Sequence, residues 1–217
     1  KNTKATMNIG SLNIRGYGSA NLKDKESRWM HLNQIMREEK IGVLAIQETH
    51  LNDERRETIE KIFPKLRVMI SEDPEQPTAK AGIALILNRH LTNWDSVEKR
   101  VIVPGRAMMV RIKWHRERKL TILCVYAPNV TEHQGGENAT FWNDIETHIQ
   151  AHPDMKPDVI IGDFNMVEEP INRLPLRNDP ADAREALDDM KMSLGMSDGW
   201  RNMYPTKRSF TFLQNGT

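Results

Sequence analysis

The sequence predicts a mixed α/β fold, and three observations support this prediction. Short apolar runs end abruptly in polar residues, as buried strands do when they leave a sheet. Longer segments carry apolar residues at helical spacing. Between residues 82 and 126, strand-like segments follow one another with short connections, which is typical of antiparallel hairpins. The length of 217 residues favours one domain, residues 1–217.

The first quarter of the chain is expected to form strand, helix and strand. Residues 7–12 and 43–46 are apolar runs that predict strands, and residues 22–40 between them predict a helix. The expected inner face of this helix carries Trp29, Leu32, Ile35 and Met36.

A second helix is expected at residues 53–63, with Asn52 as its N-cap and Pro64 ending it. A strand at residues 66–70 and a surface loop at residues 71–80 should follow. Four further strands are then expected, at residues 82–87, 96–103, 107–114 and 120–126.

The remaining chain predicts two helices around one strand. Residues 137–150 form the first helix, and its expected inner face carries Phe141, Trp142, Ile145 and Ile149. Residues 158–165 contain a short, fully apolar run that ends in Gly-Asp-Phe-Asn and predicts a buried strand. The second helix should run from Pro180 to residue 194, capped by Asp179 and closed by Gly195.

Composition limits the setting of the protein. No run of about 18 apolar residues is present, so no membrane span is expected. The single cysteine, Cys124, and the lack of an apolar leader near Lys1 favour a reducing, intracellular location. The charges nearly cancel, with 31 basic and 30 acidic residues, which is not the strongly basic balance of a dedicated nucleic-acid binder.

One short segment is locally basic. Residues 111–119 read Arg-Ile-Lys-Trp-His-Arg-Glu-Arg-Lys within an expected hairpin. Such a run is commonly a solvated turn. It also suits contact with a phosphate backbone, which requires only local positive charge.

Polar side chains stand at the ends of four predicted strands. Asn13, Glu48 and Tyr126 each follow an apolar run, and Asp163 and Asn165 follow another. Because strand ends are where α/β sheets usually place their chemistry, these five residues are expected to converge on one site.

The residue types in this set favour phosphate ester chemistry. No nucleophilic Ser-His pair and no Cys-His zinc spacing accompanies them, and hard oxygen donors suit Mg²⁺ or Mn²⁺. Glu48 is the expected principal metal ligand, with Asn13 and Asp163 beside it. Asp163 would also orient or deprotonate the attacking water. Asn165 and Asn13 would donate hydrogen bonds to non-bridging oxygens or hold the carboxylates, and Tyr126 would contact the phosphate or the leaving group.

Each of these motifs also has a structural interpretation when taken alone. Gly-Asp-Phe-Asn can be a turn with bonds from side chain to backbone. Glu48 can cap the next helix, and Tyr126 can be a core residue with a satisfied hydroxyl group. The joint appearance at four strand ends favours the catalytic interpretation.

Five motifs occur in the order known from one protein superfamily. They are Ser-Leu-Asn-Ile-Arg-Gly at residues 11–16, Ile-Gln-Glu-Thr-His at 46–50, Val-Tyr-Ala-Pro-Asn at 125–129, Ile-Gly-Asp-Phe-Asn at 161–165 and Ser-Phe-Thr-Phe, an expected short strand, at 209–212. With these motifs the sequence resembles the exonuclease/endonuclease/phosphatase superfamily, which includes deoxyribonuclease I and abasic-site endonucleases. Residues 171–175 and 197–201 are similar to LINE-type retrotransposon endonucleases of fungal genomes.

The resemblance implies two packed mixed β-sheets with helices outside, and a Mg²⁺-dependent endonuclease that acts on DNA, in a nuclear setting. It implies Glu48 as metal ligand with Asn13 beside it, Tyr126 and Asn165 on the phosphate, and Asp163 on the nucleophile. Candidate DNA contacts are Arg15, Arg111, Lys113, Arg116 and Thr211.

The sequence departs from the superfamily at its C-terminal side. Members continue into a Ser-Arg-Ile-Asp strand and a Ser-Asp-His motif that supplies the catalytic histidine pair, and this sequence contains neither. No other histidine is expected to substitute. The domain is therefore expected to be C-terminally incomplete, and these 217 residues alone would have little or no nuclease activity. Open sheet edges could pair with a C-terminal segment, another chain or a second copy.

Two other functions remain open at this stage. The same chemistry could act on a small phosphorylated substrate, because the chain is nearly neutral. Alternatively, the chain could be a catalytically degenerate module for DNA binding or assembly. Salt-dependent DNA binding would separate the first two functions, and metal-dependent turnover would separate both from the third.

Overall fold

The computed structural model describes residues 6–19, 21–24, 26–131 and 134–211. Contacts along the chain group it into two units. The first unit comprises Lys1–Tyr126 and His152–Asp163, and the second comprises Ala127–Ala151 and Phe164–Thr217. Within the described ranges, no helix is both long and apolar enough to cross a membrane.

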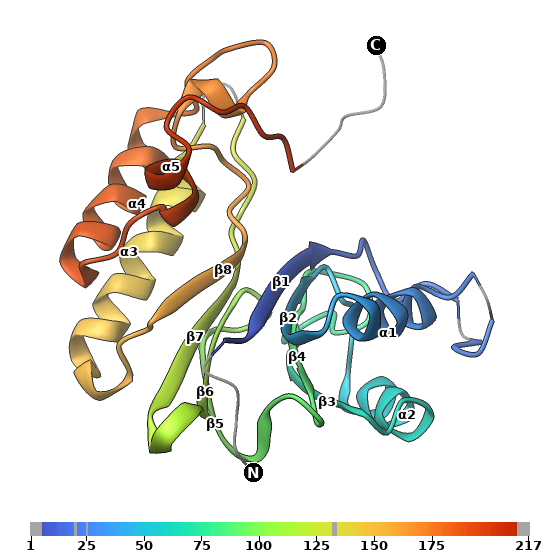
Figure 1. The fold of residues 1–217 in the computed structure, drawn as a ribbon. Coiled ribbons are helices and arrows are strands. Elements are labelled where there is room, and N and C mark those ends of the chain that lie inside the picture. The colour runs from blue at the N-terminus through green and yellow to red at the C-terminus, as the bar shows by residue number, and fades with distance from the viewer. Residues whose placement is uncertain (1–5, 20, 25, 132–133, 212–217) are drawn as a thin grey trace. The chain divides into compact units, whose positions relative to one another are not determined.

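The first unit contains two four-stranded mixed sheets (Figure 1). The first sheet has the order β1-β2-β4-β3, formed by Asn8–Asn13, Ile41–Gln47, Ile83–Asn88 and Leu66–Ser71 in that order. The second has the order β5-β6-β7-β8, formed by Asn93–Val103, Ala107–Lys113, Lys119–Tyr126 and Val159–Asp163. The pairs β1–β2 and β7–β8 are parallel and all others are antiparallel. The predicted hairpins are confirmed for β5–β6 and β6–β7, whereas β4 pairs with β2 and β3 in the other sheet and forms no hairpin with β5.

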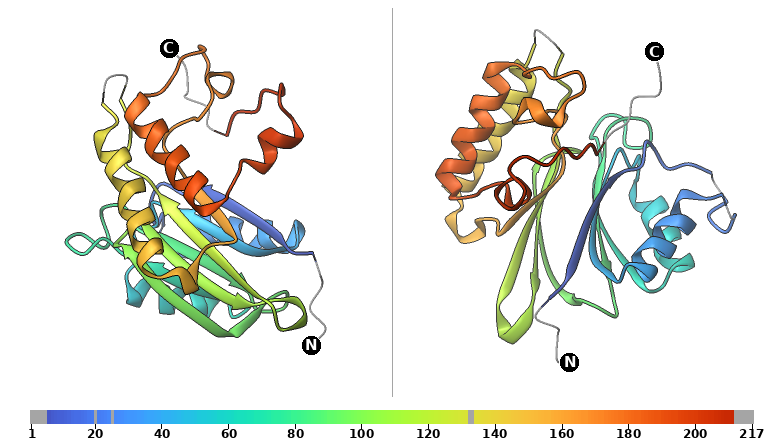
Figure 2. Two further views of the ribbon diagram at one scale, coloured as in Figure 1. Left: turned by 90° about the vertical axis from the view of Figure 1, so that its left-hand side faces the viewer. Right: turned by 45° about the horizontal axis from the view of Figure 1, so that its top comes forward.

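The two sheets pack face to face, as the right-hand view of Figure 2 shows. Strand β2 explains why this works, because alternate residues of its apolar run point to opposite faces. Val43 and Ala45 join the core between the sheets, whereas Leu44 and Ile46 join a second core on the outer face. Both faces of β2 are therefore buried, and its sequence is continuously apolar for this reason.

Two helices cover the outer face of the first sheet: α1 at Arg28–Glu38 and α2 at Asp53–Ile62 (Figure 1). Helix α1 begins six residues later than predicted. The side chains of Asn21 and Asp24 accept hydrogen bonds from nearby backbone N–H groups, and such turns compete with helix. Ile35 is 40% exposed, so its predicted inward orientation is wrong, whereas the other three predicted inner residues of α1 are buried.

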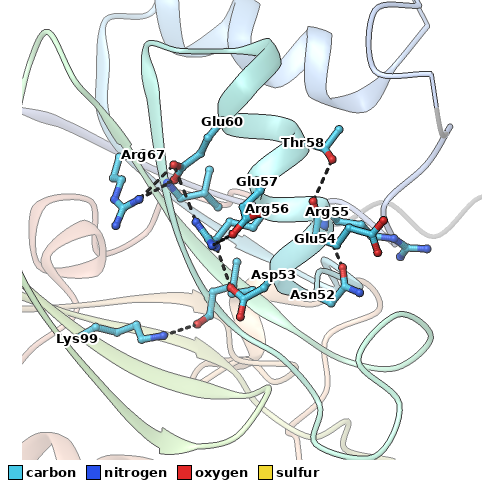
Figure 3. Close-up of polar contacts among 12 residues, drawn as sticks. Asn52, Asp53, Glu54, Arg55, Arg56, Glu57, Thr58, Glu60, Arg67 and Lys99 are labelled. Carbon is cyan, nitrogen blue, oxygen red and sulfur yellow. Dashed lines mark hydrogen bonds and ion pairs between the residues drawn. The ribbon is translucent and has the colours of Figure 1, made fainter.

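Helix α2 is fixed at both ends as its sequence predicts. The Asn52 side chain accepts from the backbone N–H of Arg55 at 3.0 Å, which confirms the N-cap. Near the other end, the Glu60 carboxylate accepts from the backbone N–H of Val68 at 2.7 Å and from the Arg67 guanidinium at 3.1 Å (Figure 3). Arg89 adds a contact at 3.4 Å. Glu60 therefore ties α2 to β3 with a carboxylate whose side chain is only 14% exposed.

Glu60→Ala is expected to lower the free energy of unfolding by about 2 kcal/mol, because charge-assisted hydrogen bonds and a backbone N–H lose their shared acceptor. Glu57→Ala, one turn earlier and 72% exposed, is the control and should cost less than about 0.5 kcal/mol. Urea unfolding of both variants measures the difference. Equal effects of the two substitutions would contradict a structural role for the Glu60 cluster.

The second unit contains α3 at Gly136–Ala151, α4 at Ala181–Leu194 and the short α5 at Gly199–Met203. Helices α3 and α4 lie side by side (Figures 1 and 2). Their buried faces include all the predicted inner residues of α3 and confirm those assignments. Gly195 closes α4 in the left-handed conformation with φ 62°, as predicted.

Three local predictions are wrong. Asp179 does not cap α4, because its carboxylate instead accepts from the backbone N–H of Val167 at 2.7 Å and from Arg173 at 2.5 Å. Residues 209–211 form no strand, and residue 212 lies outside the described ranges. Strand β8 is not fully buried: its five residues are partly exposed, because β8 is the edge strand of its sheet in the described chain. Short 3₁₀ helices lie at His115–Glu117, Pro153–Met155 and Pro170–Asn172.

Candidate active site

Four of the five predicted site residues meet in the first unit. Asn13 ends β1 and Glu48 follows β2, which runs parallel to β1 with Asn13 opposite Gln47. Tyr126 ends β7 and faces Asp163 at the end of the parallel strand β8. Because the sheets pack on each other and both parallel pairs end at the same edge, the four side chains lie together.

Hydrogen bonds join these four side chains directly. The Asn13 Nδ2 donates to Glu48 Oε1 at 2.8 Å and to Asp163 Oδ2 at 3.0 Å. The Tyr126 hydroxyl group donates to the same Glu48 oxygen at 3.0 Å. The Asn13 Oδ1 accepts from the backbone N–H of Arg15 at 3.0 Å, which fixes the orientation of the amide. One amide nitrogen thus holds two carboxylates at a single point.

The backbone at the site adopts a rare conformation. Glu48 has φ 52° and Arg15 has φ 51°, in the left-handed region that costs a residue with a side chain about 1 kcal/mol or more. Neighbouring contacts compensate for this cost. The N–H of Gly16 donates to the Glu48 carbonyl group at 2.6 Å, and Arg28 donates to the carbonyl groups of Arg15 and Gly16 at 2.6 and 2.8 Å.

The backbone conformation and close packing at Gly162 explain why the Gly-Asp-Phe-Asn motif begins with glycine. Its φ is 152°, and a Cβ added there would lie 1.9 Å from the Val125 carbonyl oxygen. Only a residue without a side chain lets β8 approach β7 this closely. That approach sets Asp163 opposite Tyr126.

The surroundings of Tyr126 keep its phenol protonated. Burial, the nearby negative charge of Glu48 and the hydrogen bond to that carboxylate raise the pKa of Tyr126 to about 12, although Arg106 opposes the shift. The hydroxyl group therefore remains a hydrogen-bond donor at neutral and moderately alkaline pH. The raised pKa also means that this group's contribution to stability is present below about pH 10 and lost as the pH rises through 12.

Up to pH 11, the Tyr126→Phe variant and the parent protein are expected to show almost the same ultraviolet tyrosinate signal. The reason is that a phenol with a pKa of about 12 is only about one tenth ionised at pH 11, so Tyr126 contributes little to the signal of the parent protein. Parallel titrations of the variant and the parent protein measure this. A parent protein that shows one additional fully ionised tyrosine at pH 11 would contradict the raised pKa.

Asn165, the fifth predicted residue, belongs to the second unit. It has φ 52°, and its Nδ2 donates to the Ala127 carbonyl group at 2.7 Å. Nearby, the buried Asn138 of α3 donates to the carbonyl groups of Pro128 at 2.7 Å and Phe164 at 3.1 Å. The segments that follow Tyr126 and Asp163 in the chain are thereby joined to each other.

The comparison with known proteins gives structural likeness only. No protein-family model matches the sequence, and no curated protein matches it. An AP endonuclease from Archaeoglobus fulgidus is similar with a TM-score of 0.72 and 19% identity, over 98% of this chain and 80% of that chain. AP endonuclease LMAP from Leishmania major has a TM-score of 0.71 and 14% identity, over 92% and 70%. The chain has the deoxyribonuclease I-like fold.

The same deoxyribonuclease I-like fold carries more than one activity among the similar structures. A mannosyl-6-phosphatase from Bacteroides thetaiotaomicron matches with a TM-score of 0.53 and 10% identity, over 85% of this chain and 70% of that chain. The two packed mixed sheets with flanking helices confirm the predicted fold class.

The donor set of this site fits a hard divalent cation. Glu48 and Asp163 supply carboxylate oxygens at one point, and Mg²⁺ commonly binds through one or two carboxylates together with water and a substrate phosphate. Asn13 presents its nitrogen to the carboxylates, so it holds the ligands in position with its oxygen turned toward Arg15. Within the described residues, no group of three or more histidine, cysteine or acidic side chains forms a denser metal cluster.

Three residues that support the site were not among those predicted from the sequence. Arg28 holds the loop after β1, as described above, and Asn138 joins the segments after β7 and β8. Arg106 lies with its guanidinium carbon 5.1 Å from the centre of the Tyr126 ring and donates to the Tyr126 carbonyl group at 3.2 Å. None of the three belongs to a motif, so no local pattern indicates its role.

The predicted DNA contacts lie in different places. Arg15 follows Asn13 at the site. Lys113 and Arg116 lie at the far end of the β6–β7 hairpin, about 24 Å from Tyr126 along β7. Arg111 is engaged with Glu98 at 3.1 Å and Thr121 at 3.1 Å. Thr211 is exposed in the second unit.

Proposed function

We propose that the protein is a divalent-metal-dependent phosphodiesterase that acts on DNA as an endonuclease domain, of the LINE retrotransposon type. The observation that carries this proposal is the pair of carboxylates, Glu48 and Asp163, held by the single amide nitrogen of Asn13 beside the protonated Tyr126. A nuclear setting is part of this proposal, as the resemblance to LINE-type endonucleases implies.

Glu48 and Asp163 would hold Mg²⁺ or Mn²⁺, with Asn13 fixing both carboxylates. The bound ion would supply Lewis-acid polarisation of the phosphoryl group. The Tyr126 phenol stays neutral, so its one O–H could turn from Glu48 Oε1 to donate to a phosphate oxygen when the substrate is bound. Asp163 would also orient the attacking water.

Positive charge next to the site supports a nucleic-acid phosphate as the group that is bound. The guanidinium group of Arg106 lies against Tyr126 and carries a permanent charge, whereas Arg15 contacts the site through its backbone N–H. The β6–β7 hairpin would supply a second contact through Lys113 and Arg116, about 24 Å along the strand from Tyr126. Phosphate contacts of this kind position a duplex without reading its sequence.

A small phosphorylated substrate is the alternative. The net charge of +1 favours it over a long polyanion, and the similar mannosyl-6-phosphatase shows that the fold is compatible with it. A degenerate module for DNA binding or assembly is the third candidate. The edge strands β1 and β8 of the described sheets favour it, because an edge can pair with a strand of another chain.

Three activities should be measured, each in the presence of Mg²⁺ and in the presence of a chelator. They are nicking of plasmid DNA, cleavage of a duplex with one abasic site, and hydrolysis of a sugar phosphate. We expect metal-dependent DNA cleavage, and DNA affinity that falls steeply with salt concentration. Faster sugar phosphate hydrolysis with salt-insensitive DNA binding would favour the alternative. DNA binding without metal-dependent turnover of any substrate would favour the degenerate module.

A further inference from the structure

The first unit contains a cavity that takes no part in the proposed function. Its volume is about 380 Å³, within the range of small-molecule sites. It lies between the C-terminal ends of α1 and α2 and the turn after β4. Lys40, one of its lining residues, directly precedes β2, whereas Glu48 directly follows that strand. The length of β2, about 20 Å, therefore separates the cavity from the candidate active site.

The cavity combines an apolar floor with a basic rim. Met36, Phe63 and Leu66 form the buried floor, each 6% exposed or less, and the apolar lining above them includes the partly buried Ile62 and the exposed Pro64 and Leu91. Arg37, Lys40, Lys65 and His90 line the rim and are exposed. The lining contains no carboxylate.

The rim cations lack internal counter-ions. Within the described residues, no ion pair joins Arg37, Lys40 or Lys65 to an acidic side chain. By contrast, the neighbouring Arg67 and Arg89 are both paired with Glu60. Arg67 and Arg89 are thus neutralised by an acidic side chain, whereas the three cations at the cavity rim can interact with a bound anion.

The helix ends do not cancel this positive charge. Two helix C-termini adjoin the cavity, and each carries roughly half a negative elementary charge. Three formal positive charges on the rim outweigh them. The turn that carries His90 is also fixed, because the Asn88 Oδ1 accepts from the backbone N–H of His90 at 3.0 Å.

We propose that this cavity binds a small amphipathic anion. Its apolar body would lie against Ile62, Pro64 and Leu91 above the buried floor, and its carboxylate or similar head group would lie at the Arg37, Lys40 and Lys65 rim. Charge complementarity excludes a cationic head group. The small apolar floor requires an apolar body, which simple inorganic anions lack. The proposal is independent of the metal and phosphate chemistry at Glu48.

Octanoate titration of the ¹⁵N-labelled full chain, followed by nuclear magnetic resonance, is the test, with octylamine, octanol and inorganic phosphate as matched probes. Octanoate should shift the amide signals of residues 33–40, 62–66 and 88–91 and bind at least about tenfold more tightly than each other probe. The double variant Arg37→Glu/Lys65→Glu should weaken octanoate binding about tenfold. Lys156→Glu, at another exposed lysine, should change it less than twofold.

If the double variant unfolds, the single variants Arg37→Glu and Lys65→Glu replace it. Each should weaken octanoate binding, but by a smaller factor than the double variant. The proposal is overturned if octanol or octylamine binds as tightly as octanoate, or if no probe shifts these signals. Competition by inorganic phosphate or duplex DNA at equal strength would also overturn it, since the apolar floor would then contribute nothing.

Discussion

Glu48→Gln is expected to lower metal-stimulated DNA cleavage by about 100-fold or more while the fold is retained. The substitution keeps the shape of the side chain but removes the charge that would bind the divalent ion. In the parent protein, the Asn13 amide nitrogen and the Tyr126 hydroxyl group both donate to Glu48 Oε1, and the substitution places an amide beside these two donors. Initial rates across a Mg²⁺ titration measure the effect.

Glu75→Gln is the matched control for this experiment, because Glu75 is exposed in the loop after β3. Its cleavage rate and its Mg²⁺ midpoint should equal those of the parent protein. Asp163→Asn should resemble Glu48→Gln, since both carboxylates are held by one amide. Undiminished cleavage by Glu48→Gln, with an unchanged Mg²⁺ midpoint, would refute the proposed metal site.

Asn138→Leu is expected to cause the largest loss of stability, about 3 kcal/mol or more. Its side chain is 0% exposed and joins three groups: two backbone carbonyl oxygens and the Trp142 indole N–H, which donates to Asn138 Oδ1 at 2.7 Å. Leucine leaves all three without this partner in a dry environment, and each unsatisfied buried polar group costs about 1–3 kcal/mol. Denaturant unfolding provides the measurement.

Asn143→Leu, an exposed position on the same helix, controls for helix propensity and added apolar area. It should change the unfolding free energy by less than about 0.5 kcal/mol. Asn138→Leu should also reduce cleavage, because its partners Pro128 and Phe164 closely follow Tyr126 and Asp163 in the chain. Similar stabilities of the two variants would contradict the role assigned to Asn138.

Local sequence patterns predicted most elements because their physical causes are local. The alternation of Val43 and Leu44 between two cores follows from strand geometry alone. The Asn52 cap and the Gly195 closure depend on residues within one helical turn. Asp179 failed as a cap for the opposite reason, because a partner twelve residues away in the chain, Val167, binds its carboxylate.

The same distinction between local and long-range causes applies to the residues of the candidate active site. Polar residues at strand ends predicted Asn13, Glu48, Tyr126 and Asp163, and the parallel strand pairs bring them together. Arg106 and Asn138 could not be predicted, because their roles depend on rings and carbonyl groups that only folding places beside them. The distance of about 24 Å between the basic hairpin and Tyr126 likewise depends on which end of β7 each occupies.

The sequence by itself determined the order of strands and helices and the chemical types at the strand ends, because hydrophobic periodicity and capping act over a few residues. Only the tertiary structure decided that one amide nitrogen holds Glu48 and Asp163, that burial beside Glu48 keeps Tyr126 protonated, and that β8 is an edge strand. These properties depend on distances between residues up to 150 positions apart in the chain, and packing of the two sheets sets those distances.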